Sequence, residues 1–372
     1  MKQANVRLPV MTGDVSGVCS VLYELGGMVV MHDPSGCNST YNTHDEIRWY
    51  DQPSLIFLSG LKHSDAIMGN DDKLINDIVT AAKMYQPNFI AICNSPIPYI
   101  IGTDFEAISL LVEQETGIPT FYVQTNAMHD YVHGASAALK KVVKMFAAHK
   151  RQSELPLVNI IGTTPLDYTN KKSIMSLKSW LTAQGYEVNA NLSFDTQFDE
   201  LKQLLDADVN LVVSGIGFET AKMLERDYGI PYVVGLPVKG MEEQLDICLK
   251  QAIKTKESCL AYEREDSYED YLFIGDPVVM GSLSCRVKGR VLCPNESAVS
   301  LLTTGGQLID GEEELIEAIG HPEVVIADPL YNYYIDENVR FIELPHFALS
   351  GRLYRKRIPD LLTFDWREED ES

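Results

Sequence analysis

Short apolar runs rich in β-branched residues alternate along the chain with longer segments whose apolar residues recur at helical spacing. The first part of the chain contains predicted strands at residues 27–31, 55–59, 87–93 and 119–123, with predicted helices at 71–85 and 104–116. Polar, glycine or proline residues follow each of these strands, at the end where open α/β sheets bind ligands. The alternation is typical of βαβ units and predicts an α/β protein with mainly parallel sheets.

The same pattern recurs in two further blocks after a polar segment, 147–156, that has the composition of a linker. The second block contains predicted strands at 157–161, 187–190, 209–214 and 232–234 and helices at 172–184, 198–206 and 219–228. The third, with shorter elements, contains strands at 272–274, 289–292 and 324–327 and a helix at 312–319. We therefore predict three Rossmann-like domains, at residues 1–150, 151–268 and 269–372, the last ending in an acidic tail.

Composition narrows the choice of partners. The chain has 372 residues, of which 45% are hydrophobic, which is enough for sizeable cores. Its formal net charge of −22 argues against nucleic acid as a partner and suits docking to a protein with a basic face. Because no apolar run reaches the roughly 18 residues of a membrane span and the N-terminus lacks a cleavable signal, we expect a cytoplasmic protein without a membrane partner.

Seven cysteines, an odd number in a chain without an export signal, favour reduced thiols or metal ligands over a disulfide framework. Cys248 and Cys259 fall on a helical pattern and are expected to be structural. Cys285 and Cys293 lack the close spacing of a C-x-x-C zinc site. The remaining three, Cys19, Cys37 and Cys93, therefore carry the metal hypothesis.

These three cysteines are expected at one rim of a parallel sheet. Cys37 ends the string HDPSGC in a tight turn after a strand, Cys19 precedes a helical pattern at 21–25, and Cys93 ends another strand. Thiolates from separated loops are the usual ligands of iron–sulfur clusters, so a shared metal site is one interpretation. Burial in the core is the other, because free cysteine is among the most buried residue types. For Cys93 both interpretations have equal weight, whereas the glycine-rich and polar context of Cys19 and Cys37 favours ligands.

Other signals are weaker. The loop after Cys37 is rich in polar and aromatic side chains, which either line a pocket or are simply solvated; together with the preceding histidine they are His32, His44, Asp45, Glu46, Arg48 and Trp49. His129 and His133, at i and i+4, are expected on the surface rather than at a metal. The chain has no P-loop, no Gly-x-Gly-x-x-Gly fingerprint and no Gly-x-Ser-x-Gly elbow, which disfavours an ATPase, a dehydrogenase and a hydrolase.

The strings SGVCSVLYELGG, HDPSGC and NFIAICNSPIPYIIGTDFEAI together resemble nitrogenase component 1 and its relatives, among them the dark-operative protochlorophyllide, chlorophyllide and nickel-sirohydrochlorin reductases. The similarity extends through NIIGTTPLDY, VNLVVSG and GIPYVVGLP. The resemblance implies three Rossmann-like domains, a homodimer or heterodimer with a second component 1-type subunit, and an iron–sulfur cluster, most simply [4Fe–4S], at the interface. It also implies electrons from an ATP-dependent iron-protein reductase and a small, unsaturated substrate.

By this resemblance, Cys37 and Cys19 match two family ligands and Cys93 approximately a third, as it lies nine residues before Gly102 where the family pattern has six. The turn 162–165 carries no cysteine of the kind that anchors the molybdenum–iron cofactor, so nitrogen fixation is disfavoured. The resemblance thus implies a nitrogenase-like iron–sulfur oxidoreductase. Two alternatives remain: a non-catalytic scaffold for metallocluster assembly or transfer, and a metal-free small-molecule binding protein.

Overall fold

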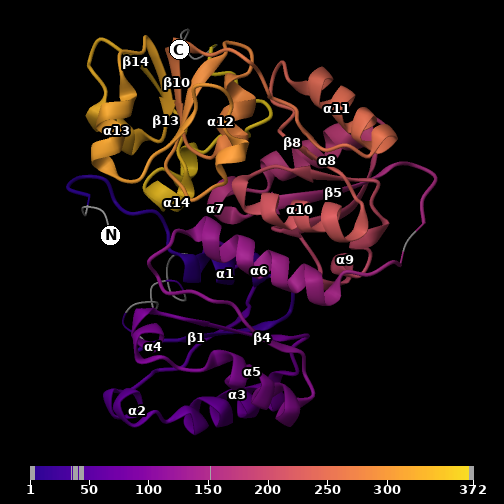
Figure 1. The fold of residues 1–372 in the computed structure, drawn as a ribbon, viewed down its shortest axis with the longest axis vertical. Helices are drawn as coiled ribbons and strands as arrows, with labels where there is room; N and C mark the ends of the chain where they lie inside the picture. Colours follow the sequence, from indigo (N-terminus) through magenta and orange to yellow (C-terminus); the bar gives the residue numbers. More distant parts are fainter. Residues whose placement is uncertain (1–4, 35, 37–40, 42–45, 151, 368–372) are drawn as a thin grey trace. The chain divides into compact units, whose positions relative to one another are not determined.

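The structure is a computed structural model that describes residues 5–34, 36, 41, 46–150 and 152–367. The chain divides into two compact units. The small unit comprises residues 12–145 and 195–199, and the large unit comprises residues 1–11, 146–194 and 200–372. The strands form three sheets in which every named strand pair is parallel, so the predicted α/β class is confirmed (Figure 1).

The small unit contains one four-stranded sheet with the order β2-β1-β3-β4. Its strands are β1 (Met28–His32), β2 (Leu55–Leu58), β3 (Ile90–Asn94) and β4 (Thr120–Tyr122). Its helices are α1 (Asp14–Leu22), α2 (His63–Met68), α3 (Asp71–Tyr85), α4 (Pro96–Ile101), α5 (Phe105–Thr116) and α6 (Tyr131–Phe146). The strand order reverses between β1 and β3, and this switch point is where open α/β sheets leave a crevice at the carboxyl ends of their strands.

Successive side chains along each strand point to opposite faces of this sheet. Met28 and Val30 of β1 belong to a core formed with α3 and α5. Val29 and Met31 point to the opposite face, where α1 and α6 lie (Figure 1). Because Met31 is in register with Cys93 of β3, Cys93 also faces α1.

The large unit contains two five-stranded sheets, ordered β6-β5-β7-β8-β9 and β12-β11-β10-β13-β14. The first comprises β5 (Leu157–Thr163), β6 (Glu187–Ser193), β7 (Val209–Val212), β8 (Tyr232–Val234) and β9 (Cys259–Leu260). The second comprises β10 (Tyr268–Ile274), β11 (Gly289–Cys293), β12 (Gln307–Leu308), β13 (Val324–Ala327) and β14 (Arg340–Glu343). Each order reverses once, between β5 and β7 and between β10 and β13.

Helices of the large unit cover these sheets, and residues 5–8 run beside the second of them. The α-helices from residue 146 onward are α7 (Pro165–Tyr168), α8 (Lys172–Ala183), α9 (Phe198–Leu201), α10 (Gly215–Tyr228), α11 (Glu242–Thr255), α12 (Pro277–Ser284), α13 (Glu312–Ile319) and α14 (Phe347–Ser350). Short 3₁₀ turns are η2 (Leu204–Asp206), η3 (Val299–Leu301), η4 (Pro329–Tyr334) and η5 (Arg355–Arg357). The Glu312 carboxylate of α13 accepts three backbone N–H groups of residues 6–8.

Three predicted features are wrong. The helix expected at 21–25, after Cys19, is instead α1, which begins at Asp14 and contains Cys19. The helix expected at 198–206 is divided into α9 and η2, because the Leu205 amide donates to the carbonyl of Ala148 and not to the helical partner four residues earlier. Cys259, expected on a helix, opens strand β9. None of the helices in the described part of the chain has the length and apolarity that crossing a bilayer requires.

Candidate functional site

Two of the three predicted cluster cysteines meet in the small unit. Cys19 lies on α1 and Cys93 near the carboxyl end of β3, both are free thiols, and neither is exposed to solvent. Their thiol groups are hydrogen-bonded to each other. Burial, followed by this contact and the nearby Glu46 carboxylate, raises the pKa of Cys19 well above its usual value. The structure therefore places both thiols close together, and the raised pKa keeps Cys19 protonated when no metal is bound.

The third cysteine, Cys37, lies outside the described residues, as do His44 and Asp45. The strand that leads to Cys37 is β1, which is next to β3 and ends at His32. Burial lowers the pKa of His32 to about 4, and its Nδ1 lies 2.8 Å from Ser59 Oγ. This imidazole is therefore neutral at pH 7 and adds no positive charge at this end of the sheet.

The close approach of α1 to α6 depends on two glycines. A Cβ on Gly17 would lie 2.2 Å from the carbonyl oxygen of Tyr131, and one on Gly134 would lie 2.0 Å from the carbonyl oxygen of Asp14. No side chain larger than hydrogen fits at either position without moving the backbone. The two glycines thus set the position of α1, and with it the position of Cys19.

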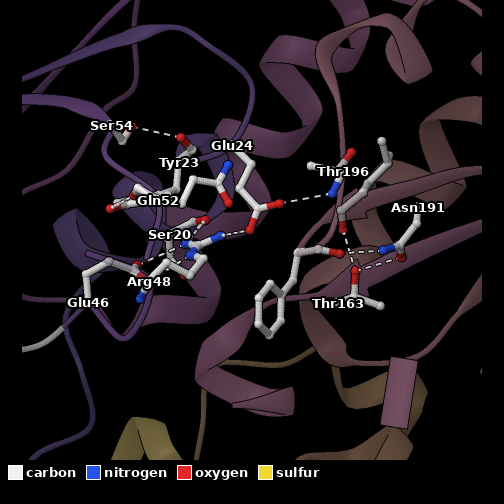
Figure 2. A network of polar contacts seen from close by, with 12 residues as sticks. Ser20, Tyr23, Glu24, Glu46, Arg48, Gln52, Ser54, Thr163, Asn191 and Thr196 are labelled. Atoms are coloured by element: carbon white, nitrogen blue, oxygen red, sulfur yellow. Dashed lines mark hydrogen bonds and ion pairs between the residues drawn. The ribbon is translucent and has the colours of Figure 1, made fainter. Parts of the chain in front are cut away.

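Sequence reasoning missed an ion pair between Arg48 and Glu46, which Figure 2 shows. The Glu46 carboxylate is near enough to the Cys19 thiol to raise its pKa. Arg48 Nε and Nη2 donate to the Glu46 carboxylate at 2.8 and 2.9 Å, and Nη1 donates to Glu24 Oε1 at 3.1 Å. Arg48 Nη2 also donates to the carbonyl oxygen of Ser20, the residue after Cys19, at 2.9 Å. Its guanidinium lies over the Tyr23 ring, 4.3 Å from the centroid. The side chains of Arg48 and Glu46 are 5% and 3% exposed, so the pair is part of the interior.

This network shows that three side chains of the loop after Cys37, those of Tyr41, Glu46 and Arg48, are buried and not solvated. Burial by itself lowers the pKa of Arg48, but the Glu46 carboxylate outweighs burial and holds that pKa above its usual value. Tyr41 donates its hydroxyl to Glu46 Oε2 at 3.0 Å, and burial followed by the Glu46 charge raises the Tyr41 pKa. The string Glu46-x-Arg48 was the available signal, although its local pattern does not distinguish a buried pair from an exposed one.

Two buried hydroxyls near the thiols have no hydrogen-bond partner among the described residues. Ser20 Oγ follows Cys19 in α1, and Ser95 Oγ lies two residues after Cys93. An unpaired buried hydroxyl costs free energy, and donation to a sulfur ligand is one way to remove that cost. Free thiols and unpaired hydroxyls are a donor set that suits a thiolate-bound iron–sulfur group.

The remaining cysteines do not join this pair. Cys248 and Cys259 lie together on α11 and β9 of the large unit. Cys285 ends α12, and Cys293 ends β11 with its Sγ 3.0 Å from Asn295 Oδ1. The rings of His129 and His133 are stacked, with centroids 4.1 Å apart, and His129 precedes α6 while His133 lies on it.

A second buried cluster, also missed, lies in the large unit where its two sheets reverse strand order. Asp276 follows β10 and accepts the Gly215 N–H, after β7, at 2.9 Å. His346, after β14, has Nε2 3.1 Å from Asp167 Oδ1, and its backbone N–H donates to Asp328 Oδ2 at 2.7 Å. Burial, followed by the Asp167 charge, raises the pKa of Asp276 to about 6. The signal for part of this cluster was the acidic residue in the turns after β10 and β13, Gly275-Asp276-Pro277 and Asp328-Pro329.

Comparison with known proteins identifies the family. The family described as "Nitrogenase component 1 type Oxidoreductase" matches residues 17–247, which include both cysteines of the thiol pair and the switch points of two sheets. The chain belongs to this family. The resemblance inferred from the sequence is therefore confirmed, and the family includes oxidoreductases.

Individual relatives are distant. The chain is 26% identical over 227 residues to the nitrogenase iron-molybdenum cofactor biosynthesis protein NifE of Clostridium pasteurianum, covering 60% of this chain and 49% of that protein. It is 27% identical over 226 residues to the nitrogenase molybdenum-iron protein alpha chain of the same organism, covering 55% and 40%. It is 23% identical over 305 residues to a subunit of the light-independent protochlorophyllide reductase of Heliobacterium modesticaldum, covering 78% and 58%. The chain thus spans about half the length of these relatives.

A solved structure titled "Nitrogenase Cp1 at pH 5" has a TM-score of 0.67 to this chain at 16% identity, covering 99% of this chain and 87% of that one. At this identity the likeness establishes the fold.

Proposed function

We propose that this chain is a catalytic subunit of a nitrogenase-like reductase, in which Cys19 and Cys93, with Cys37 as the predicted third ligand, hold an iron–sulfur cluster, most simply [4Fe–4S]. The observation that carries the proposal is the contact between two fully buried thiols at the switch point of a parallel sheet. When bound, such a cluster accepts and donates single electrons at low potential.

The residues around the thiols have separate tasks in this proposal. Cys19 and Cys93 lose their protons when iron binds, so iron should be lost in acid. Ser20 and Ser95 are available to donate hydrogen bonds to sulfur, which is one way a protein tunes a cluster. Arg48, paired with Glu46, holds its own segment against α1 through the Ser20 carbonyl.

The partners belong to the proposal as well. We expect a second component 1-type subunit, identical or related, to complete the ligand set, and an ATP-dependent iron protein to supply the electrons for a small, unsaturated substrate. One relative is named as an alpha chain and another as a subunit, which supports assembly with another chain. The net charge of −22 suits a partner with a basic docking face.

Iron content tests the proposal directly. The full chain, purified without oxygen, should be brown and contain iron, and Cys19→Ser, Cys93→Ser and Cys37→Ser should each lose most of both. Cys285→Ser is the matched control and should keep them, because that thiol lies at the end of α12 in the large unit. Circular dichroism of each variant confirms that the chain has folded. Colourless, iron-free wild-type protein that has been reconstituted with iron and sulfide would refute the proposal.

A scaffold for metallocluster assembly is the second candidate, and the similarity to the cofactor biosynthesis protein NifE favours it. Both candidates share the cysteines, so turnover decides between them. The iron-loaded chain is mixed with an ATP-dependent iron protein and a reductant, with either unsaturated tetrapyrroles or an apo-acceptor protein. Many product molecules per chain would establish the reductase, and stoichiometric transfer of iron to the acceptor would establish the scaffold. A gene neighbourhood of tetrapyrrole or cluster-assembly genes gives an independent indication.

A further inference from the structure

A second pair of thiols lies at the edge of the first sheet of the large unit. Cys248 is in the middle of α11, and Cys259 opens β9, the edge strand, in register with Val233 of β8. Only residues 256–258 connect α11 to β9. Helix α11 packs against β8, the strand next to β9 (Figure 1). This short crossover brings the two thiols together: both are free, and they are hydrogen-bonded to each other.

The two thiols differ in character. Gln244, one turn earlier on α11, donates its Nε2 to Cys248 Sγ at 3.6 Å, so Cys248 receives hydrogen bonds both from an amide and from the Cys259 thiol. The Cys259 hydrogen bond is the main cause that lowers the pKa of Cys248 to about 7. The same contact, then burial and the Glu263 charge, raise the pKa of Cys259. The Gln244 hydrogen bond stabilises a thiolate at Cys248, so Cys248 is the nucleophile of the pair and Cys259 holds the proton.

Access limits which oxidant reaches this pair. Cys248 is 8% exposed and Cys259 is partly exposed, so the thiolate is near the surface but has little open area. Hydrogen peroxide is small enough to reach such a thiolate. Larger disulfide reagents need a free line of approach to the sulfur atom, which the buried Cys248 does not offer.

We infer that Cys248 and Cys259 are a peroxide-reactive dithiol that closes to an intramolecular disulfide. The Cys248 thiolate attacks one oxygen of hydrogen peroxide, the O–O bond breaks, and hydroxide leaves, so that Cys248 becomes a sulfenic acid. The Cys259 sulfur then attacks the Cys248 sulfur, the S–O bond breaks, and water leaves with the Cys259 proton. In total, two thiols and one peroxide give one disulfide and two waters, and the thiols supply both electrons.

The other cysteines of the large unit provide internal comparisons. Burial raises the pKa of Cys285, so this half-buried thiol is mostly protonated at pH 7. Cys293 is fully buried, and its Sγ contacts the Asn295 side-chain oxygen. Cys285 is therefore the internal control for peroxide treatment, because it is partly exposed but mostly protonated.

Peptide mapping of the full-length protein tests the inference. The protein is treated at pH 7 with one equivalent of hydrogen peroxide, blocked with N-ethylmaleimide and digested with trypsin without reductant. Cleavage places Cys248 in peptide 240–250 and Cys259 in peptide 257–264. A linked species joining these two peptides, absent after reduction, is the expected product. Recovery of both peptides alkylated while Cys285 is oxidised would overturn the inference.

Two variants separate the chemical steps. Cys259→Ser should abolish the linked peptides and leave a sulfenic acid on Cys248 that dimedone traps. Cys285→Ser is the matched control and should leave the linked peptides at the wild-type yield. If Cys259→Ser accumulates no dimedone adduct on Cys248 although the protein is folded by circular dichroism, Cys248 is not the peroxide-reacting residue and the inference fails. The readout does not depend on iron or on a substrate.

Discussion

The buried ion pair beside the candidate cluster site offers the sharpest test of the structural reasoning. In Arg48→Met, the Glu46 carboxylate stays in an interior position but loses both guanidinium hydrogen bonds. Breaking a buried pair by removing one partner costs about 3–5 kcal/mol. Because Glu46 keeps its bond from Tyr41, we expect the lower figure, about 3 kcal/mol. That loss corresponds to a roughly 100-fold increase in the local opening constant of the small unit.

Amide hydrogen exchange followed by mass spectrometry measures this opening constant for individual peptides, which suits a chain of two compact units. Peptides from α1 and β1 should exchange about 100-fold faster in Arg48→Met than in the wild type. The matched control is Lys73→Met, which breaks the exposed pair with Asp77, whose side chains are 39% and 60% exposed. Exposed pairs contribute about 0–1 kcal/mol, so this control should change exchange less than about fivefold.

A double variant distinguishes the buried charge from lost packing. Glu46→Gln removes the charge that Arg48→Met leaves unpaired, so the combined variant should be less destabilised than the sum of the two single variants. If Arg48→Met exchanged no faster than Lys73→Met, or if the two single effects simply added, the account of a desolvated pair supporting α1 would be refuted.

Three further predictions concern other parts of the chain. Burial by itself lowers the pKa of His346, but the Asp167 carboxylate outweighs burial and raises that pKa above the unfolded value of about 6.5. The His346–Asp167 pair therefore stabilises the folded state fully below about pH 6.5, and this stabilisation is lost as the pH rises through the folded pKa. Urea unfolding as a function of pH should show this loss, and Asp167→Asn should remove the pH dependence. Gly17→Ala should destabilise the small unit by about 2 kcal/mol, as measured by amide exchange in α1. Gly13→Ala is the control and should cost less than about 0.5 kcal/mol, because its Cβ would have no neighbour closer than 3.9 Å. Equal effects of the two substitutions would contradict the steric argument. Glu312→Ala should accelerate exchange of the three N-terminal amides that donate to this carboxylate by about tenfold, and unchanged rates would show that those bonds are absent in solution.

Much of the fold follows from local pattern. Residues 71–85 form α3, 312–319 form α13 and 324–327 form β13 with the limits predicted from spacing alone. These elements were predictable because hydrophobic periodicity reports directly which backbone conformation places apolar side chains on one face. The parallel arrangement of the sheets was predictable as well, because a helix between two successive strands provides the crossover connection that parallel strands require.

The candidate site was only partly predictable. Sequence context marked Cys19 and Cys93 as candidates, and the structure shows that they touch. The ligand role of these cysteines and of Cys37 stays a prediction. Nothing in the local pattern indicated that Arg48 and Glu46 are buried, because a polar loop has the same sequence whether water or protein surrounds it.

The sequence by itself therefore determined the class of the fold, the family and the identity of the candidate thiols, all of which depend on residue types and short spacings. The tertiary structure decided which thiols pair. Strand register and the glycine contacts of α1 bring Cys19 to Cys93, whereas the short crossover from α11 to β9 brings Cys248 to Cys259. The physical reason is that contacts between distant segments depend on how faces pack, and packing is a property of the assembled core and not of any single segment.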